Sequence, residues 1–413
     1  MGEWLEKRMD EIADFNPRES ISKGTIAKKI AMDKLQPFCR DVPSYEMEAF
    51  TNGTKFRNGD TIMARITPCL ENGKTAKVDI LNEEEVGFGS TEYIVFRAKE
   101  GNDPDFIYYL VTSPVVREPA IKSMVGSSGR QRVQTDVVQG LKVRVPNLEG
   151  QQAIASVLKA LDDKIAANRK INENLEQQAV LLFRSWFSSF SQSENVSRRG
   201  SEFGEIPVDF SVTKVGSLPM LVTDYVANGS FASLKKNVTL YQEPNYAYFV
   251  RNTDLKSGSF GVFVDQHSYE FLSKSTLYGG EIIISNVGDV GSVFLCPKLD
   301  GPMTLGNNII MLRPEDDTLR YYLYIWFKHL QGQALIQGIT GGSAQPKFNK
   351  TDFKNTSVLL PPAEMLSRFH ATVTPMFEAI DQNQAENASL SSLRDTLLPR
   401  LMSGELDVSD LDL

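Results

Sequence analysis

Histidine and cysteine are scarce in this chain of 413 residues, which contains three of each. They are His267, His329 and His370, and Cys39, Cys69 and Cys296. None of the six has a neighbour at the spacing of a zinc-binding motif, and three dispersed histidines do not indicate a catalytic triad. We therefore expect no metal site, and free thiols in a reducing, cytoplasmic compartment.

Several sequence motifs of catalysis are also absent. There is no GxxxxGK[ST] motif for nucleotide phosphates and no GxGxxG that opens a helix after a strand. The Asn/Asp-Pro-Pro-aromatic tetrapeptide of amino-methyltransferases is missing too. Acidic pairs such as Asp162-Asp163 are typical of a solvated helix face. These absences predict a binding and scaffolding protein with no active site and no cofactor of its own.

Long apolar runs are missing as well. No run approaches the roughly 20 residues of a membrane span, and the N-terminal MGEWLEKRMDEIADF lacks the apolar core of a signal peptide. We expect no membrane association. The 52 acidic and 44 basic residues give a formal net charge of −8, which argues mildly against nucleic-acid binding. Net charge is a weak argument, however, because the local field decides where a polyanion binds.

The chain does contain a long heptad pattern between Glu149 and Phe190. Its seam positions alternate in steps of four and three residues: Ile154, Leu158, Leu161, Ile165, Asn168, Asn172, Leu175, Ala179, Leu182 and Trp186. A pattern held for more than four heptads predicts a helix that packs against another helix along its whole length. At about 1.5 Å per residue this helix would be roughly 60 Å long.

The partner helix is expected in the same chain, 215 residues later. The equivalent positions are Phe369, Val373, Met376, Ile380, Asn383, Asn387, Leu390, Arg394, Leu397 and Leu401. Nine of these ten keep their character, and Arg394 is the exception. In an antiparallel pair Asn168 meets Asn387 and Asn172 meets Asn383, and such buried layers fix the register. A parallel pair also matches the asparagines, and two unrelated amphipathic helices remain an alternative.

The internal repeat extends to the segments that precede the two helices. Ser90–Arg97 corresponds to Gly306–Arg313 at an offset of 216, and each half has paired tyrosines and a glycine-rich loop. We therefore predict an α+β protein in which an antiparallel coiled coil of two long helices separates two α/β domains, with a pseudo-twofold repeat. The predicted segments are domain 1 (1–146), the central helix (147–190), a flexible linker (191–204), domain 2 (205–361), the distal helix (362–403) and an acidic tail (404–413).

Pro375 is a flaw in the predicted distal helix. A proline inside a helix costs about 3 kcal/mol, because it removes a backbone donor and clashes with the preceding turn. We expect Thr374 to cap the helix and Pro375 to take its first position, so that the rod begins there.

Basic residues gather in loops at equivalent places in the two halves. Residues 117–144 contain six Lys or Arg against two acids, and residues 328–354 contain four against one. Glycine permits close approach to a phosphate, and Arg, Lys, Asn and Gln bind phosphates or read base edges. Ordinary solvated turns are the alternative. The candidate DNA contacts are Arg65, Thr67, Asn72, Lys74, Ser90, Ser127, Ser128, Gly129, Arg130, Gln131, Arg132, Asn286, Asn307, Asn308, Gly341, Gly342, Ser343, Gln345 and Lys347.

Several stretches of the chain resemble the specificity subunit of type I restriction-modification enzymes. LKALDDKIAANRKINENLEQQAVLLFRSWF (158–187) is similar to the central region of this family, and LLPRLMSGE (397–405) to its distal region. ARITPCLENGKTA (64–76) and GFGSTEY (87–93) are similar to one class of target recognition domain. The resemblance covers nearly the whole chain, although the second domain matches mainly in architecture.

The resemblance implies a function. Two target recognition domains would read the two halves of a split, asymmetric site in double-stranded DNA, with the coiled coil as a ruler. Two modification (methyltransferase) subunits would carry S-adenosylmethionine, and restriction subunits would add translocation and cleavage driven by ATP with magnesium. An alternative of another class is a self-contained DNA-modifying enzyme or nuclease with an unrecognised site. A third is a coiled-coil adaptor with no role on nucleic acid.

Overall fold

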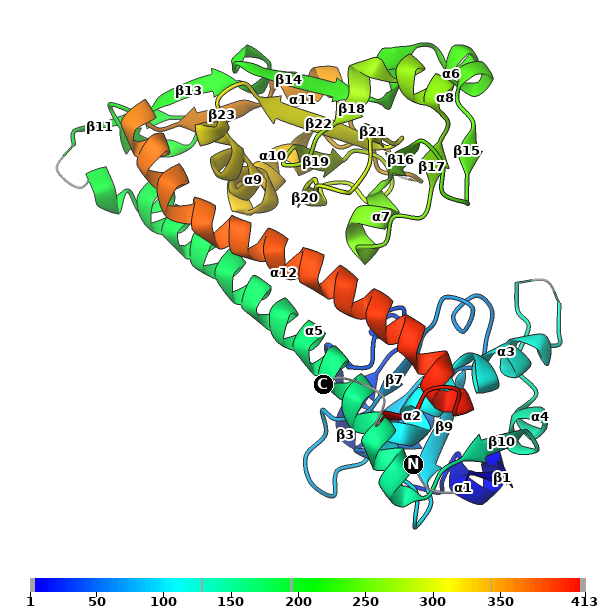
Figure 1. Cartoon of the computed structure of the whole chain (residues 1–413). Coiled ribbons are helices and arrows are strands. Elements are labelled where there is room, and N and C mark those ends of the chain that lie inside the picture. The colour runs from blue at the N-terminus through cyan, green and yellow to red at the C-terminus, as the bar shows by residue number, and fades with distance from the viewer. Residues whose placement is uncertain (1–3, 128, 194–195, 343, 409–413) are drawn as a thin grey trace. The chain divides into compact units, whose positions relative to one another are not determined.

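The computed structural model describes residues 4–127, 129–193, 196–342 and 344–408, so the candidates Ser128 and Ser343 and the tail residues 409–413 lie outside the described part. The chain forms two compact units. Unit 1 comprises residues 1–170 and 383–413, and unit 2 comprises residues 171–382. Each unit contains a mixed α/β domain and segments of the two long helices, α5 (Leu148–Phe183) and α12 (Ala363–Ser403) (Figure 1).

Unit 1 is built on two four-stranded sheets and a short strand pair. The first sheet, in the order β2-β9-β6-β7, comprises Ala13–Phe15, Tyr93–Ala98, Thr61–Ala64 and Thr75–Lys77, and all its pairings are antiparallel. The second sheet, β4-β3-β8-β5, comprises Glu46–Ala49, Ile26–Ile30, Gly87–Gly89 and Thr54–Phe56. The remaining elements are β1 (Leu5–Arg8), α1 (Met9–Ile12), α2 (Pro104–Thr112), α3 (Pro114–Lys122), α4 (Thr135–Gln139) and β10 (Lys142–Val145), which pairs with β1.

Unit 2 repeats this topology with additions. Its first sheet, β14-β22-β19-β20, comprises Met220–Asp224, Ile309–Pro314, Ile282–Ser285 and Val293–Leu295, again all antiparallel. Its second sheet, β15-β17-β16-β21-β18, comprises Leu240–Tyr241, Phe263–Val264, Ala247–Val250, Met303–Leu305 and Thr276–Leu277. The other elements are β11 (Arg198–Ser201), β12 (Gly204–Pro207), β13 (Ser211–Lys214), α6 (Phe231–Asn237), α7 (Asn252–Ser257), α8 (Gln266–Phe271), α9 (Arg320–Lys328), α10 (Leu330–Ile339), α11 (Lys350–Asn355) and β23 (Ser357–Leu360), which pairs with β13.

The central strand of the first sheet in each unit is buried on both faces. Ile62 of β6 belongs to the core beside the second sheet of unit 1, whereas its neighbour Met63 belongs to the core that contains residues of α2 and α5. In unit 2, Ile283 of β19 faces the second sheet, and Ile282 and Ile284 face the helices. Burial on both faces explains why these strands read as uninterrupted apolar runs in the sequence.

A buried carboxylate–arginine pair joins two neighbouring strands of the first sheet in each unit. Asp60, which is 1% exposed, lies just before β6 and accepts from the Arg97 guanidinium at 2.7 Å. Glu281, which is 3% exposed, lies just before β19 and accepts from Arg313 at 2.9 Å. The Gly-Asp and Gly-Glu turns in the sequence therefore place a carboxylate against an arginine from the neighbouring strand. The α+β architecture and its repeat were predictable from these patterns.

The long helices supply apolar side chains to the core of each unit. In unit 1, Ile154 and Leu158 of α5 and Leu397 and Leu401 of α12 join the core that contains α2. In unit 2, Phe183 of α5 and residues of α12 join the core that contains α9. Phe183, Phe187 and Phe369 stack edge to face there, with ring centroids 5.0–6.1 Å apart.

Two sequence-based expectations about chain breaks are wrong. α12 runs without interruption from Ala363 through Pro375 to Ser403, so the rod does not begin at Pro375. Thr374 does not cap the helix but donates its hydroxyl to the carbonyl oxygen of His370 at 2.7 Å. Val373 and Phe377 are buried on either side of the proline, and their packing outweighs the backbone penalty.

The predicted flexible linker, 191–204, is likewise ordered in part. Arg198–Ser201 pairs antiparallel with Gly204–Pro207 to form a hairpin. Ile206 is fully buried, and the ring of Phe203 lies 5.4 Å from that of Trp326. These two apolar side chains hold the hairpin on unit 2, although the segment is otherwise polar.

Candidate nucleic-acid interface

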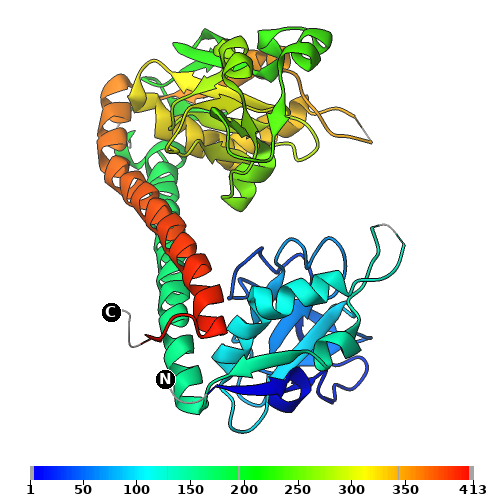
Figure 2. The same ribbon diagram turned by 45° about the vertical axis from the view of Figure 1, so that its right-hand side comes forward.

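The first glycine-rich loop of the chain is anchored at both ends by backbone bridges. In unit 1, Arg132 pairs with Val125 across the loop and also with Ile66, which follows β6. The amide of Thr67 donates to the carbonyl oxygen of Gln131 at 3.0 Å. Residues 126–127 and 129–131 therefore project from a three-way junction of backbone segments rather than from a free turn. Figure 2 shows this loop, which follows α3, extending away from the body of unit 1.

Unit 2 builds the same junction from different residues. Lys347 pairs with Gly341 and also with Val287, which follows β19. The amide of Gly288 donates to the carbonyl oxygen of Pro346 at 2.9 Å, as Thr67 does in unit 1. The loop after α10 extends from the body of unit 2 (Figure 2). The two loops that the sequence paired, 126–132 and 341–347, are thus held by equivalent backbone hydrogen bonds.

Each loop begins at a glycine that no other residue replaces easily. Gly126 has a φ of 135° and Gly342 a φ of 92°. A Cβ atom on Gly126 would lie 2.9 Å from the carbonyl oxygen of Arg130, and one on Gly342 would lie 2.6 Å from that of Gln345. Glycine is required because the chain turns back on itself there.

The side chains of Arg65 and Asn286 form hydrogen bonds with the backbone just after each loop. The guanidinium of Arg65 donates to the carbonyl oxygen of Val133 at 3.1 Å, and the amide side chain of Asn286 donates to that of Phe348 at 3.2 Å. Their backbones make matching bonds to Glu92 and Asn308. Among the described residues, neither Arg65 Nε nor Asn286 Oδ1, both buried, has a partner. The side chains of these two candidates bond to the backbone of the junction.

Three further candidates in unit 1 are also engaged within the protein. The Thr67 hydroxyl donates to the Gln131 carbonyl oxygen at 3.3 Å, and Lys74 Nζ donates to the Met32 carbonyl oxygen at 2.8 Å. Ser90 Oγ accepts from the amide of Glu92 at 3.1 Å. These three side chains shape the surface near the loop base.

The remaining candidates lie at or near the surface of their own units. In unit 1 Asn72, Ser127, Gly129, Arg130 and Arg132 are exposed, and Gln131 is half-buried. In unit 2 Asn307, Asn308, Gly341, Gly342, Gln345 and Lys347 are exposed. Each loop thus carries at least one cation and one amide side chain, which are the groups that bind phosphates and base edges.

The sequence did not single out Glu92, which the structure brings to the loop of unit 1. Arg132 Nε donates to both carboxylate oxygens of Glu92, at 3.0 and 2.9 Å, and Arg132 Nη2 donates to Oε1 at 2.6 Å. The hydrogen bonds and charge of Arg132 hold the pKa of Glu92 below its usual range, so this carboxylate is ionised at neutral pH. Forty residues separate the partners, and no sequence periodicity links them.

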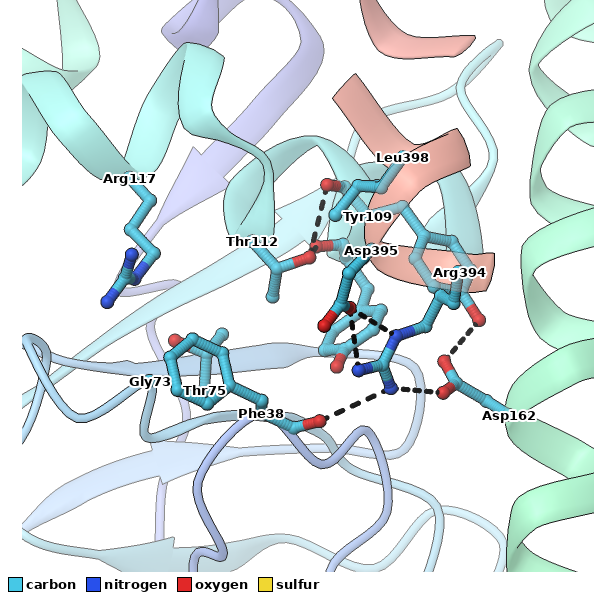
Figure 3. Close-up of a pocket in the computed structure, with 11 residues that line it drawn as sticks. Phe38, Gly73, Thr75, Tyr109, Thr112, Arg117, Asp162, Arg394, Asp395 and Leu398 are labelled. Atoms are coloured by element: carbon cyan, nitrogen blue, oxygen red, sulfur yellow. Dashed lines mark hydrogen bonds and ion pairs between the residues drawn. The ribbon is translucent and has the colours of Figure 1, made fainter. Parts of the chain in front are cut away.

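A second group joins the long helices to domain 1, and it includes Asp162. The sequence predicted this residue on a solvated helix face, which is wrong because Asp162 is 5% exposed. Arg394 of α12 donates to Asp162 of α5 at 2.7 Å, and Tyr109 of α2 donates to the same carboxylate at 2.8 Å (Figure 3). Arg394 also donates to the carbonyl oxygen of Phe38 at 3.3 Å. Arg394 was the one charged position in the second seam, and that departure was the available signal.

The cavity beside this group has a volume of about 50 Å³. It is lined by Phe38, Thr75, Arg117 and Leu398, among others (Figure 3). Pockets for cofactors or drug-sized ligands are about 300–1,000 Å³. This space is sufficient for one or two water molecules, so we interpret the group as an anchor between α2, α5 and α12.

Farther along the same helices, Asn168 is 1% exposed. Its amide donates to Asn387 Oδ1 at 3.0 Å and to Glu386 Oε2 at 2.6 Å. In unit 1 the contacts therefore run from Asp162–Arg394 to Asn168–Asn387, so that residue numbers rise along α5 while they fall along α12.

The described part of the chain contains neither a metal-binding cluster nor a membrane-spanning helix. Residues 4–127, 129–193, 196–342 and 344–408 include no group of three or more His, Cys, Asp or Glu arranged to hold a metal ion. Within the same ranges, none of the helices combines the length and apolar character that a bilayer crossing requires.

Two domains of one topology, each with a glycine-rich loop on a backbone junction and each joined to a long helix, define a duplicated recognition protein. The chain belongs to the family of the type I restriction modification DNA specificity domain, whose model matches residues 1–177 and 226–390. This membership confirms the resemblance drawn from the sequence.

Relatives of known name and a solved structure are similar over most of the chain. The MjaIX specificity subunit of Methanocaldococcus jannaschii is 28% identical over 76% of this chain and 71% of its own length. The HindI specificity subunit of Haemophilus influenzae is 24% identical over 98% of this chain and all of its own. The crystal structure of a type I restriction-modification S subunit from M. genitalium is similar with a TM-score of 0.53, at 16% identity, over 97% of this chain and 96% of that one.

Proposed function

We propose that this chain reads a split, asymmetric DNA target for a type I restriction-modification complex, with one unit on each half of the target. The observation that carries this proposal is the loop junction, built twice with identical backbone bonds but different exposed side chains. A common frame with variable contacts is suited to reading two different short sequences.

We propose that the exposed loop candidates of each unit contact DNA, whereas Arg65, Thr67, Lys74 and Asn286 position them. Glycine-rich backbone allows close approach to phosphates, and the amide and guanidinium groups offer donors to base edges. The net charge of −8 does not oppose this, because the exposed loops of the two halves carry local basic character.

We propose that α5 and α12 form an antiparallel coiled coil that separates the two recognition domains, with Asn168, Asn172, Asn383 and Asn387 fixing its register. The Asn168–Asn387 bond in unit 1 and the packing of Phe183 on Phe369 in unit 2 support an antiparallel pairing. α5 has 36 residues, which at about 1.5 Å each gives about 54 Å, or about 16 base pairs of B-DNA. Bases between the half-sites would go unread.

We propose that chemistry resides on partner subunits. Two modification subunits would bring S-adenosylmethionine and transfer the methyl group, and restriction subunits would bring ATP and magnesium. The names of the relatives, which are specificity subunits of restriction enzymes, support this division of labour. The present chain would then act as a double-stranded DNA reader and a scaffold.

An exchange of domain 1 tests the proposal. Residues 1–146 are replaced by the equivalent segment of a relative that recognises another target, and methylated adenines in the host genome are mapped by single-molecule sequencing. We expect one half of the methylated motif to change, while the other half and the spacer stay as in the parent. A motif that is unchanged, or that changes in both halves, contradicts the proposal.

The chain alone gives a second measurement. Purified protein incubated with DNA and magnesium, and separately with S-adenosylmethionine, should yield neither cleaved nor methylated DNA. Adding the modification subunits should restore methylation. Product formed by the chain alone would favour a self-contained enzyme.

A further inference from the structure

The backbone of Arg132 is fixed although it lies at the end of a glycine-rich loop. Its amide donates to the Val125 carbonyl oxygen at 2.9 Å, and its own carbonyl oxygen accepts from the Val125 amide at 3.0 Å. A second bridge joins Arg132 to Ile66. The starting point of the side chain is therefore held from two sides.

The guanidinium is fixed as well. Three hydrogen bonds join its Nε–Nη2 edge to the carboxylate of Glu92. Glu92 is itself constrained, because its amide donates to Ser90 Oγ and its carbonyl oxygen accepts from the amide of Arg65. The Glu92 side chain is 23% exposed and that of Arg132 is 47% exposed, so the carboxylate lies beneath and the guanidinium faces outward.

One edge of the guanidinium remains available. Among the described residues, no acceptor is bonded to Arg132 Nη1, so the Nη1–Nη2 fork is open to a ligand. Such a fork matches either a phosphate or the O6 and N7 atoms of guanine. Because Glu92 already compensates the charge of Arg132, the attraction to a phosphate is weakened, whereas the directional fork is retained. The guanidinium of Arg132 is therefore better suited to a base edge than to a phosphate of the DNA backbone.

We propose that Arg132 reads a guanine in the half-site contacted by unit 1, and that Glu92 is the positioning residue that aims it. The proposal rests on the proposed function and names a specific contact within it. Because the ion pair orders the side chain before DNA arrives, less conformational entropy is lost on binding.

The described residues of unit 2 contain no arginine–carboxylate pair at the equivalent place. Lys347 takes the place of Arg132 in the junction, and Asn308 takes the place of Glu92. Lysine is a point charge without a planar fork, and asparagine offers no carboxylate to orient it. The guanine contact is therefore assigned to one half-site only.

Three variants of the full chain, assembled with its modification subunits, test the proposal: Arg132→Ala, Arg132→Lys and Glu92→Gln. The readout is the methylated motif and the affinity for matched duplexes in which one base pair is altered. We expect Arg132→Ala and Arg132→Lys to lose about 5- to 150-fold in discrimination at one guanine of one half-site, with the other half unchanged.

Glu92→Gln should separate positioning from simple charge. Removing a negative charge beside Arg132 should strengthen binding to unrelated DNA, while discrimination at the same guanine falls. A merely structural role would instead weaken both together and lower the melting temperature. The matched control is Lys142→Ala, which breaks the exposed ion pair with Glu6 at 2.8 Å on β10 and β1 of the same unit. We expect it to keep the motif.

Other outcomes overturn the proposal. If Arg132→Ala leaves the motif intact and weakens all sequences equally with a shallower salt dependence, Arg132 contacts a phosphate. If all three variants behave as the parent, Arg132 does not contact DNA. In either case the exchange of residues 1–146 shows whether unit 1 still reads a half-site, so failure of this inference is distinguishable from failure of the proposed function.

Discussion

Arg394 occupies a seam position of α12, where the heptad pattern favours an apolar side chain. It is 9% exposed, and Asp162, which is 5% exposed, faces it from α5. Burial by itself lowers the pKa of Arg394, but the charge and hydrogen bond of Asp162 raise it overall, so the guanidinium stays charged. Replacing one partner of a buried ion pair is strongly destabilising, because the charge of the other partner stays buried without compensation.

We predict that Arg394→Ala lowers the free energy of unfolding by about 3–5 kcal/mol, since Asp162 is left as an uncompensated buried carboxylate. Urea denaturation of the full chain measures this change, and hydrogen exchange of the last turns of α12 locates it. The control is Arg400→Ala on the same helix, whose partner Glu405 is 66% exposed. That variant should cost less than about 1 kcal/mol.

A double replacement sharpens the interpretation. Arg394→Met with Asp162→Asn removes both charges but keeps an acceptor for Tyr109, so most of the lost stability should return. If the double variant is as unstable as Arg394→Ala, the loss comes from packing of the arginine stem and not from the unpaired charge.

For individual side chains, some contacts can be predicted from the sequence and others cannot. Arg394 and Asn168 are visible because each departs from an apolar heptad, and a departure indicates a partner on the facing helix. The pairing of Arg132 with Glu92 is hidden, because it depends on how two loops meet after the sheet has formed. Arg65 and Asn286 were predicted as DNA contacts, and their bonds to backbone carbonyl oxygens depend on a backbone geometry that residue types do not reveal.

Among the elements, α12 shows how tertiary packing outweighs local propensity. Pro375 predicts a helix start, yet the helix continues because Val373 and Phe377 are buried beside it. The strands β6 and β19 were predictable from their turn and apolar run. The hairpin of β11 and β12 was not, because only Phe203 and Ile206 in a polar segment find apolar partners.

The asparagine layer gives a prediction for the helix pair. Asn168 Oδ1 is buried and has no partner among the described residues, and an unsatisfied buried acceptor costs about 1–3 kcal/mol. Asn168→Leu with Asn387→Leu should therefore raise the free energy of unfolding by a similar amount, while it removes the penalty on shifted registers. Urea denaturation measures the first effect.

Disulfide trapping measures the second effect, in a background without the three native cysteines. Cysteines at Ile165 and Leu390 would share a layer in the expected register, and cysteines at Ile165 and Leu397 would be one heptad apart. The parent should cross-link only the first pair, and the double leucine variant should cross-link both. A variant that stays in one register would show that asparagine does not specify it.

For the whole molecule, the central question is whether both halves engage one duplex. The repeated sheets, ion pair and loop junction show that one domain design occurs twice in the chain. The sequence predicts this duplication well, because offsets near 215 are maintained in strands, loops and helices. Target bases remain beyond the sequence, because they depend on side-chain placement in loops of five or six residues.

Salt dependence distinguishes one-unit from two-unit binding. Each phosphate contact contributes about one unit to the slope of log affinity against log salt. Arg130 and Lys347 are exposed cations on the loops of unit 1 and unit 2. We predict that Arg130→Ala and Lys347→Ala each weaken DNA binding and reduce the slope by about one, and that the double variant reduces it by about two.

The matched controls are Lys142→Ala in unit 1 and Lys236→Ala in unit 2, which remove exposed lysines away from the loops and should leave the slope unchanged. Titration by fluorescence anisotropy at several salt concentrations gives the slopes for the complex with its modification subunits. If only one of the two loop variants alters the slope, a single unit grips the duplex, and the ruler role of the helices is excluded. The salt slope counts only the phosphates that the protein contacts in the bound complex. If the double variant lowers the slope by the sum of the two single changes, both loops therefore contact phosphates of the same duplex.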